Sequence, residues 1–146
     1  MERTEALQFW NDMWQEGNWF PSIPDSLAGL SAADAAWSPD PKCHSIWQEV
    51  VHLTFWRKIT LRHWAEGRGS TDEEVEREEF KAPEEVTEEA WTAAVAALKE
   101  TQDQIAAAIQ DENIDIHRVP YHLVHDPYHL GRITQLRAMQ GVSPKF

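Results

Sequence analysis

The sequence predicts an all-α protein, a four-helix bundle with a long crossover between its second and third helices. Four segments carry apolar residues three and four positions apart, which is the spacing of one helix face. No segment alternates apolar and polar residues as a half-buried strand does, and no unit of about 20 to 50 residues repeats. The 146 residues, 42% of them hydrophobic, suffice for a single domain with its own core, residues 1–146.

The first predicted helix spans residues 2–16 and ends at Gly17. Its apolar face consists of Ala6, Leu7, Trp10, Met13 and Trp14. Prolines and a glycine interrupt residues 18–41, although Ser31, with Asp34 three residues later, could cap a short helix there. Whether the chain before Ser31 continues the first helix stays open at this point.

The second predicted helix spans residues 43–64, which contain no helix breaker, and the run ends at Gly67. Its apolar residues cover much of the circumference, so we expect it to be buried on more than one side. The connection that follows, residues 68–86, is too long for a tight hairpin and indicates a crossover. Residues 70–89 contain ten acidic and two basic side chains, which is typical of a solvated segment.

The third and fourth predicted helices have the clearest boundaries. Thr87 suits the N-cap of the third helix, and acidic residues follow it in the first turn. The buried face of that helix consists of Trp91, Val95, Leu98, Ile105 and Ile109. The fourth helix begins near Pro120 and runs to Met139 or Gln140, with Gly141 as its stop signal.

The charge balance excludes several classes of partner. Acidic residues outnumber basic ones by 25 to 13, and the formal net charge of -12 disfavours both nucleic acid and anionic membrane surfaces as partners.

The N-terminus shows neither a signal peptide nor a membrane-spanning run. Cys43, the single cysteine, cannot form an internal disulfide, which agrees with a reducing compartment. We therefore expect a cytoplasmic protein.

Three of the seven histidines fit a metal site. His125 and His129 are four residues apart, so on a helix their rings project from one face. His52 lies in the middle of the second helix among apolar residues, where an unpaired polar ring would be costly. Three neutral imidazoles leave a fourth position open on a divalent ion, and zinc or nickel would suit them.

Other interpretations of these histidines are open from spacing alone, because helical histidines are often ordinary core or surface residues. His44 and His63 lie about 12 and about 16 Å from His52 along the helix axis, which is too far for them to bind the same metal. His122, three residues before His125, is an alternative ligand. Pro127 removes a helical hydrogen bond between the paired histidines, and a helix that began after it would abolish the pair.

Two segments resemble the DinB-like (YfiT-like) superfamily of four-helix-bundle metalloproteins. HSIWQEVVHLTFWR, residues 44–57, is similar to its second-helix signature, and HDPYHLGRITQLR, residues 125–137, is similar to its fourth-helix signature. In that superfamily one histidine of the second helix and two of the last bind a divalent metal, often nickel or zinc. The resemblance implies that His52, His125 and His129 are the ligands here.

The resemblance also implies a choice of functions. Characterised relatives include thiol-dependent S-transferases and isomerases that use bacillithiol or mycothiol, while many members have no known reaction. The first hypothesis is therefore a metal-dependent thiol S-transferase that acts on small molecules. The alternative is a non-catalytic, metal-stabilised bundle that binds a ligand or protein partner, including a homodimer formed through a Trp-rich surface.

Four charged residues near the predicted ligands receive provisional roles. Glu49 and Asp126 could support a metal, but the sequence favours ordinary acids on the helix surface. Arg132 stands where the family commonly has glutamine, and it alters the charge near the site. An anionic thiol needs a basic anchor on this acidic protein, for which Arg132 is the favoured candidate and Arg137 the second.

Overall fold

The structure, a computed structural model that describes residues 1–142, contains helices and no strand in that range. The prediction of an all-α protein is confirmed. The helices are α1 (Arg3–Gln15), α2 (Ile23–Leu27), α3 (Ala32–Ala36), α4 (Ile46–Glu66), α5 (Asp72–Glu78), α6 (Glu88–Gln110) and α7 (Val119–Gln140). None of them is long and apolar enough to cross a membrane.

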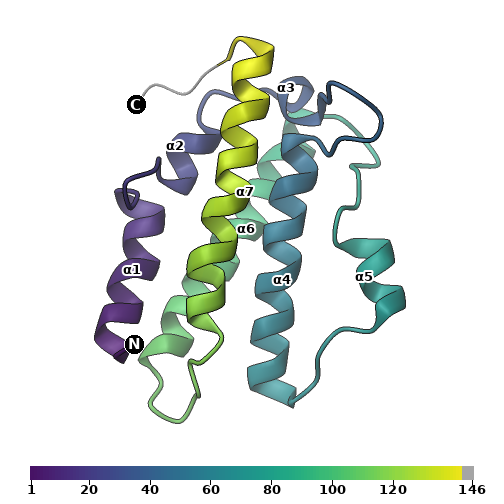
Figure 1. The fold of residues 1–146 in the computed structure, drawn as a ribbon. Helices are drawn as coiled ribbons and strands as arrows, with labels where there is room; N and C mark the ends of the chain where they lie inside the picture. Colours follow the sequence, from purple (N-terminus) through teal and green to yellow (C-terminus); the bar gives the residue numbers. More distant parts are fainter. Residues whose placement is uncertain (143–146) are drawn as a thin grey trace.

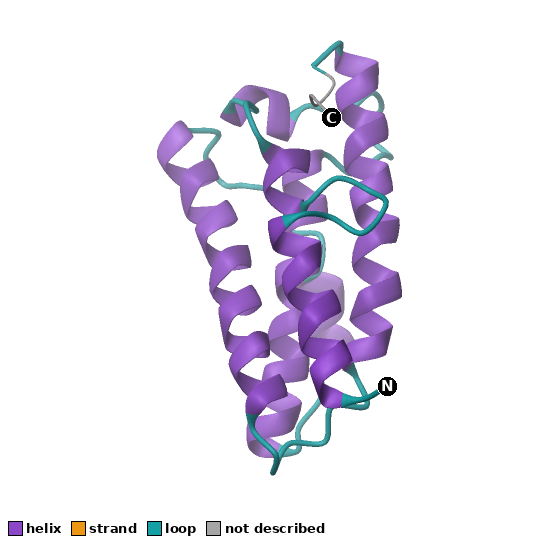
Figure 2. Cartoon of the chain, turned by 90° about the vertical axis from the view of Figure 1, so that its left-hand side faces the viewer, coloured by secondary structure: helices purple, strands orange, loops and turns teal. Residues whose placement is uncertain are grey.

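The four long helices α1, α4, α6 and α7 lie along one another (Figures 1 and 2). Both α6 and α7 pack against α1 and α4, so the order around the bundle is α1, α6, α4, α7. Neighbours α4 and α6 run in the same direction, and the chain between them returns along the outside of the bundle through α5 (Figure 1). Parallel neighbours require such a crossover.

Helix α4 begins three residues later than the predicted start, because Ser45 caps it. The Ser45 hydroxyl accepts a hydrogen bond from the Gln48 amide at 3.2 Å, and the Gln48 side chain accepts one from the Ser45 amide at 2.9 Å. This reciprocal pair satisfies two donors of the helix end. At the other end Gly67 adopts φ 67°, a left-handed conformation that glycine tolerates without strain, and the helix stops there.

Replacing Ser45 by alanine should lower the free energy of unfolding by about 1 kcal/mol, since the Gln48 amide loses its acceptor. Urea unfolding of the metal-free protein measures the change. Ser70→Ala is the matched control, because the Ser70 hydroxyl makes no hydrogen bond within the described residues; we expect it to stay within about 0.5 kcal/mol of the parent. Equal values for both variants would contradict the capping role.

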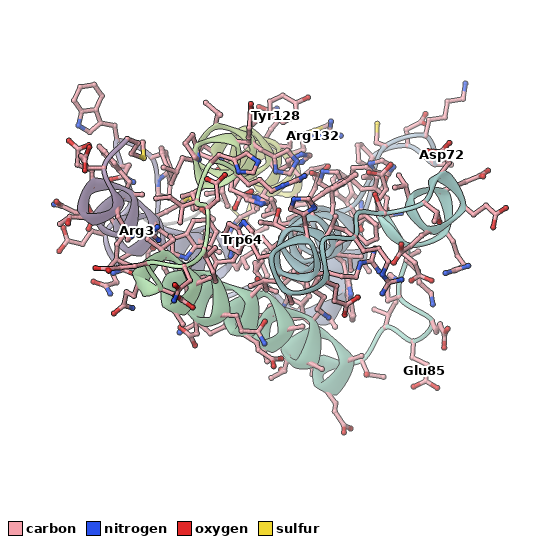
Figure 3. All side chains as sticks on the ribbon, turned by 90° about the horizontal axis from the view of Figure 1, so that it is seen from below. Arg3, Trp64, Asp72, Glu85, Tyr128 and Arg132 are labelled. Atoms are coloured by element: carbon pink, nitrogen blue, oxygen red, sulfur yellow. The ribbon has the colours of Figure 1, made fainter. Side chains whose placement is uncertain are left out.

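Of the three short helices, one was expected, one answers a question that the sequence left open, and one was not predicted. Helix α2 is separate from α1, with Ser22 as its own cap, and α3 forms where Ser31 and Asp34 predict it. Helix α5 was not predicted. It lies inside the acidic segment, has no buried residue, and sends side chains such as Asp72 away from the bundle (Figure 3).

The core of the bundle is mostly apolar, and its buried charged and histidine side chains gather mainly where α4 faces α7. Its largest fully buried apolar side chains include Trp10, Met13, Ile46, Leu53, Leu98 and Ile133. Between α4 and α7, however, buried polar side chains come together, namely Glu49, His52, Arg57, His122, Asp126 and His129. Buried charge must be compensated nearby, and the contacts of this group decide what the interior of the bundle can do.

Candidate metal centre

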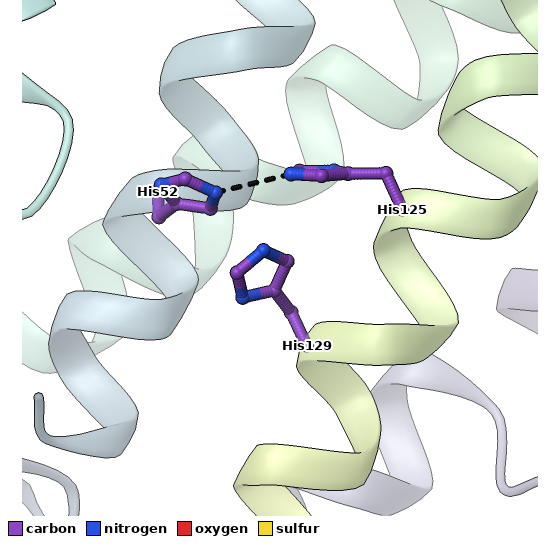
Figure 4. A group of neighbouring side chains, drawn as sticks. All are labelled: His52, His125 and His129. Carbon is purple, nitrogen blue, oxygen red and sulfur yellow. Dashed lines mark hydrogen bonds between the residues drawn. The ribbon is translucent and has the colours of Figure 1, made fainter.

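The structure brings His52, His125 and His129 together in the middle of the bundle (Figure 4). His52 reaches in from α4, and the other two project from successive turns of α7. The Nε2 atoms of His52 and His125 are 3.0 Å apart, and the His129 ring centroid lies 4.2 Å from that of His52. His52 and His129 are buried, while His125 is partly exposed.

Pro127 does not break the pair on α7. The helix continues from Val119 to Gln140 with the proline inside it, so His125 and His129 keep their common face. The proline has no N–H to donate to the carbonyl four residues earlier, which is a loss of one backbone hydrogen bond. The fourth predicted helix therefore exists over its whole expected length.

The distances and charges of the three rings suit a metal ion. Two nitrogen ligands at about 2.0–2.1 Å from a tetrahedral zinc are about 3.3 Å from each other, close to the Nε2–Nε2 separation found here. Burial, reinforced by repulsion from His129 and His125, lowers the pKa of His52 to about 3. The ring is therefore neutral near pH 7, which is the form that binds metals.

Carboxylates face the Nδ1 side of the histidines. Glu49 Oε2 lies 2.5 Å from His129 Nδ1, and Asp126 Oδ1 lies 3.0 Å from His125 Nδ1. Each carboxylate can accept a hydrogen bond from an Nδ1–H, and that choice of tautomer leaves the Nε2 lone pair free. The same arrangement of carboxylate, histidine and metal is common in metalloproteins, where it orients the ligand ring.

The expectation that Glu49 and Asp126 lie on the helix surface is wrong. Both are 0% exposed. The helical pattern contained a signal, since Glu49 is three residues after Ile46 and four before Leu53, both of them buried. Asp126 likewise precedes buried Leu130 by four residues. Each carboxylate shares its helix face with core side chains, and each is buried because a basic partner compensates its charge.

Arg57 compensates Asp126. Its Nε and Nη2 lie 2.9 and 2.7 Å from Asp126 Oδ2, and its Nη1 donates to Gln102 at 3.0 Å. The guanidinium also lies over the Trp10 ring, 4.5 Å from the centroid. Burial alone would raise the pKa of Asp126, but the charge of Arg57, the contact with His125 and the nearby His122 ring hold that pKa well below its usual range. Asp126 is therefore a fixed, ionised acceptor.

The sequence suggested Arg132 and Arg137 as anchors for an anionic ligand, but in the structure both pair with groups of the protein. Arg132 Nε lies 2.8 Å from Glu49 Oε1 as an ion pair, although the alignment falls short of a hydrogen bond. Tyr128 lies beside it on α7 (Figure 3). Arg137 is buried and donates to the carbonyls of Val142 and Ser26 at 2.7 and 2.9 Å. Neither guanidinium is placed as a free anchor.

The remaining alternative, His122, has a different role from the three central rings. Its Nε2 lies 2.8 Å from the Thr60 hydroxyl, which makes a hydrogen bond across to α4. It could join His125 and Asp126 in a second group able to hold a metal. That group shares His125 with the first, so one ion at the centre excludes the other.

Replacing Glu49 by glutamine should weaken zinc binding about 10–100-fold, the usual cost of removing a carboxylate that orients a ligand. Competition with a chromophoric chelator measures the affinity. Glu66→Gln is the control, because Glu66 is exposed and, among residues 1–142, pairs only with Arg68. An unchanged affinity in the Glu49 variant would show that this carboxylate does not support the site.

Comparison with known proteins gives a family match. A family model described as the DinB superfamily matches residues 22–138, a stretch that includes all three central histidines and both carboxylates. No curated protein and no solved structure matches the chain.

Proposed function

The chain belongs to the DinB superfamily, and we propose that it binds one divalent ion, nickel or zinc, through His52, His125 and His129 and uses it for thiol S-transfer to small molecules. The observation that carries the proposal is the convergence of the three rings, with carboxylates behind two of them. The thiol cofactor would be of the bacillithiol or mycothiol type that the superfamily resemblance implies.

The donor set supports a cationic centre. Three neutral imidazoles would leave the full charge on a bound ion, which would lower the pKa of a thiol beside it. A free thiol has a pKa of about 8.5, so a modest shift suffices to ionise it near pH 7. The negative charges of Glu49 and Asp126 are offset by Arg132 and Arg57, so the centre would remain attractive to a thiolate.

His125 is the partly exposed member of the three. It lines a cavity of about 270 Å³, together with Trp56, Ile59, Thr60, Arg118, Tyr121 and His122. This volume is just below the range of about 300–1,000 Å³ that is typical of small-molecule sites. Such a cavity suits a small substrate, which supports the transferase hypothesis.

Metal analysis tests the site directly. Protein purified without a histidine tag, stripped with a chelator and reloaded, should hold one zinc or nickel ion per chain. We expect His52→Ala and His129→Ala to lose that ion, because each removes one of the few ligands. His117→Ala is the control, since His117 is exposed and its one partner within the described part of the chain is Asp115. Full occupancy in the folded His52 and His129 variants would refute the ligand assignment.

A conjugation assay tests the reaction. The metal-loaded protein is supplied with bacillithiol, mycothiol or glutathione and with a haloarene as the electrophile. We expect turnover with one of these thiols that requires the metal and disappears in His125→Ala. Background rates with every thiol would favour the alternative function.

That alternative, a metal-stabilised bundle that binds a ligand or partner, draws on exposed apolar side chains of α7. Tyr121, Val124 and Tyr128 are 70%, 71% and 62% exposed. A homodimer through a Trp-rich surface stays a prediction, and only Trp19 and Trp37 are exposed among the tryptophans. Sedimentation equilibrium of the metal-loaded protein distinguishes a monomer from a dimer.

A further inference from the structure

Arg118 stands at the start of α7 and lines the cavity that leads to His125. The other walls include two aromatic side chains, Trp56 and Tyr121, and the apolar Ile59. The cavity therefore joins a guanidinium, flat apolar surfaces and a histidine of the candidate metal centre. No role for Arg118 follows from the helix pattern or from the three histidines.

The Arg118 side chain makes no hydrogen bond or ion pair with residues 1–142, and its Nε is shielded from solvent. By contrast, the guanidiniums of Arg57, Arg132 and Arg137 all have acceptors in the protein. The two Nη groups of Arg118 are neither shielded nor paired within residues 1–142, so they are the donors that a ligand in the cavity could use. Asp126 does not compete for Arg118, because Arg57 already engages it.

We propose that this cavity binds the carboxylate of a small aromatic or branched acid, with Arg118 as its anchor. A guanidinium matches a planar carboxylate through two parallel N–H donors, and the apolar part of the ligand would lie against Trp56, Ile59 and Tyr121. On a protein with a net charge of -12, a local cation is what makes an anion site feasible.

The inference deepens the proposed function, on which it rests through His125, because the cavity and the candidate metal centre share that residue. The acid held at Arg118 would be the substrate, or the part of it that positions the rest beside the three histidines. This assigns to Arg118 the anchoring role that the sequence favours for Arg132.

The test compares two probes of equal shape, phenylacetate and phenylacetamide, by ligand-observed NMR on metal-free and on zinc-loaded protein. In the parent we expect phenylacetate to bind at least about tenfold more tightly than the amide, the effect of one charge-assisted hydrogen-bond pair. In Arg118→Gln the two affinities should become equal, and Arg118→Lys should restore part of the difference. Arg68→Gln, on an exposed arginine paired with Glu66, should leave it unchanged.

Equal affinities of the two probes in the parent, no binding of either, or an unchanged preference in Arg118→Gln would overturn the assignment. So would phenylacetate binding that needs zinc but ignores Arg118, since the carboxylate would then be held by the ion. Metal content measured on the same samples separates the two claims. A parent that holds no zinc yet prefers phenylacetate through Arg118 would refute the metal function and leave this inference standing.

Discussion

Arg57→Met should destabilise the metal-free protein by about 3–5 kcal/mol, the typical cost of leaving one charge of a buried pair without its partner. Arg57 and Asp126 are both completely buried, and Asp126 accepts two hydrogen bonds from that guanidinium. Methionine fills much of the volume of the arginine stem, so the loss reports the missing charge more than a cavity. Urea unfolding in the presence of a chelator measures it, free of any contribution from bound metal.

Two further variants show whether the loss comes from the unpaired charge. Arg68→Met breaks an exposed pair, with 66% and 54% of the two side chains accessible, and should cost no more than about 1 kcal/mol. Arg57→Met combined with Asp126→Asn removes both charges and should recover part of the loss. A cost for Arg57→Met as small as that for Arg68→Met would mean that Asp126 does not depend on Arg57 for its charge.

The long helices could be predicted from the sequence because each combines a wide apolar face with a strong boundary signal. Thr87 accepts the expected hydrogen bond at the start of α6, and Gly141 ends α7 in a left-handed conformation. Helix α5 could not be predicted, because it lacks an apolar face. It has seven residues, none of them buried, so no hydrophobic periodicity marks it.

The histidines of the candidate centre could be nominated from the sequence because ligands on one helix must be three or four residues apart. The burial of the carboxylates could not be decided from their place on the core face of each helix, because a charged residue lies on the surface unless a partner compensates it. The partner of Asp126 is 69 residues away along the chain, and spacing within one helix carries no information about it. The same holds for Arg118, whose lack of an acceptor becomes visible only when the surrounding helices are in place.

Zinc should stabilise the stripped protein strongly, because an ion that binds only the folded chain adds its binding free energy to folding. At a free concentration a thousand times Kd, the gain is about 4 kcal/mol. For a domain of this size that corresponds to a rise in Tm of roughly 8–16 °C. Thermal unfolding with and without zinc measures it, and magnesium, which prefers oxygen ligands, is the control ion and should give no shift.

The histidine variants then decide where the ion sits. His129→Ala should abolish the zinc-dependent shift, because it leaves two of the three converging rings. His122→Ala should retain it, since His122 bonds to Thr60 outside the central group. If His122→Ala abolished the shift and His129→Ala retained it, the ion would instead lie in the second group, formed by His122, His125 and Asp126. There a carboxylate would replace an imidazole as a ligand, through Asp126 Oδ1, which faces His125 and His122. Asp126 would keep its Oδ2 on Arg57 but would lose the hydrogen bond that His125 can donate to Oδ1.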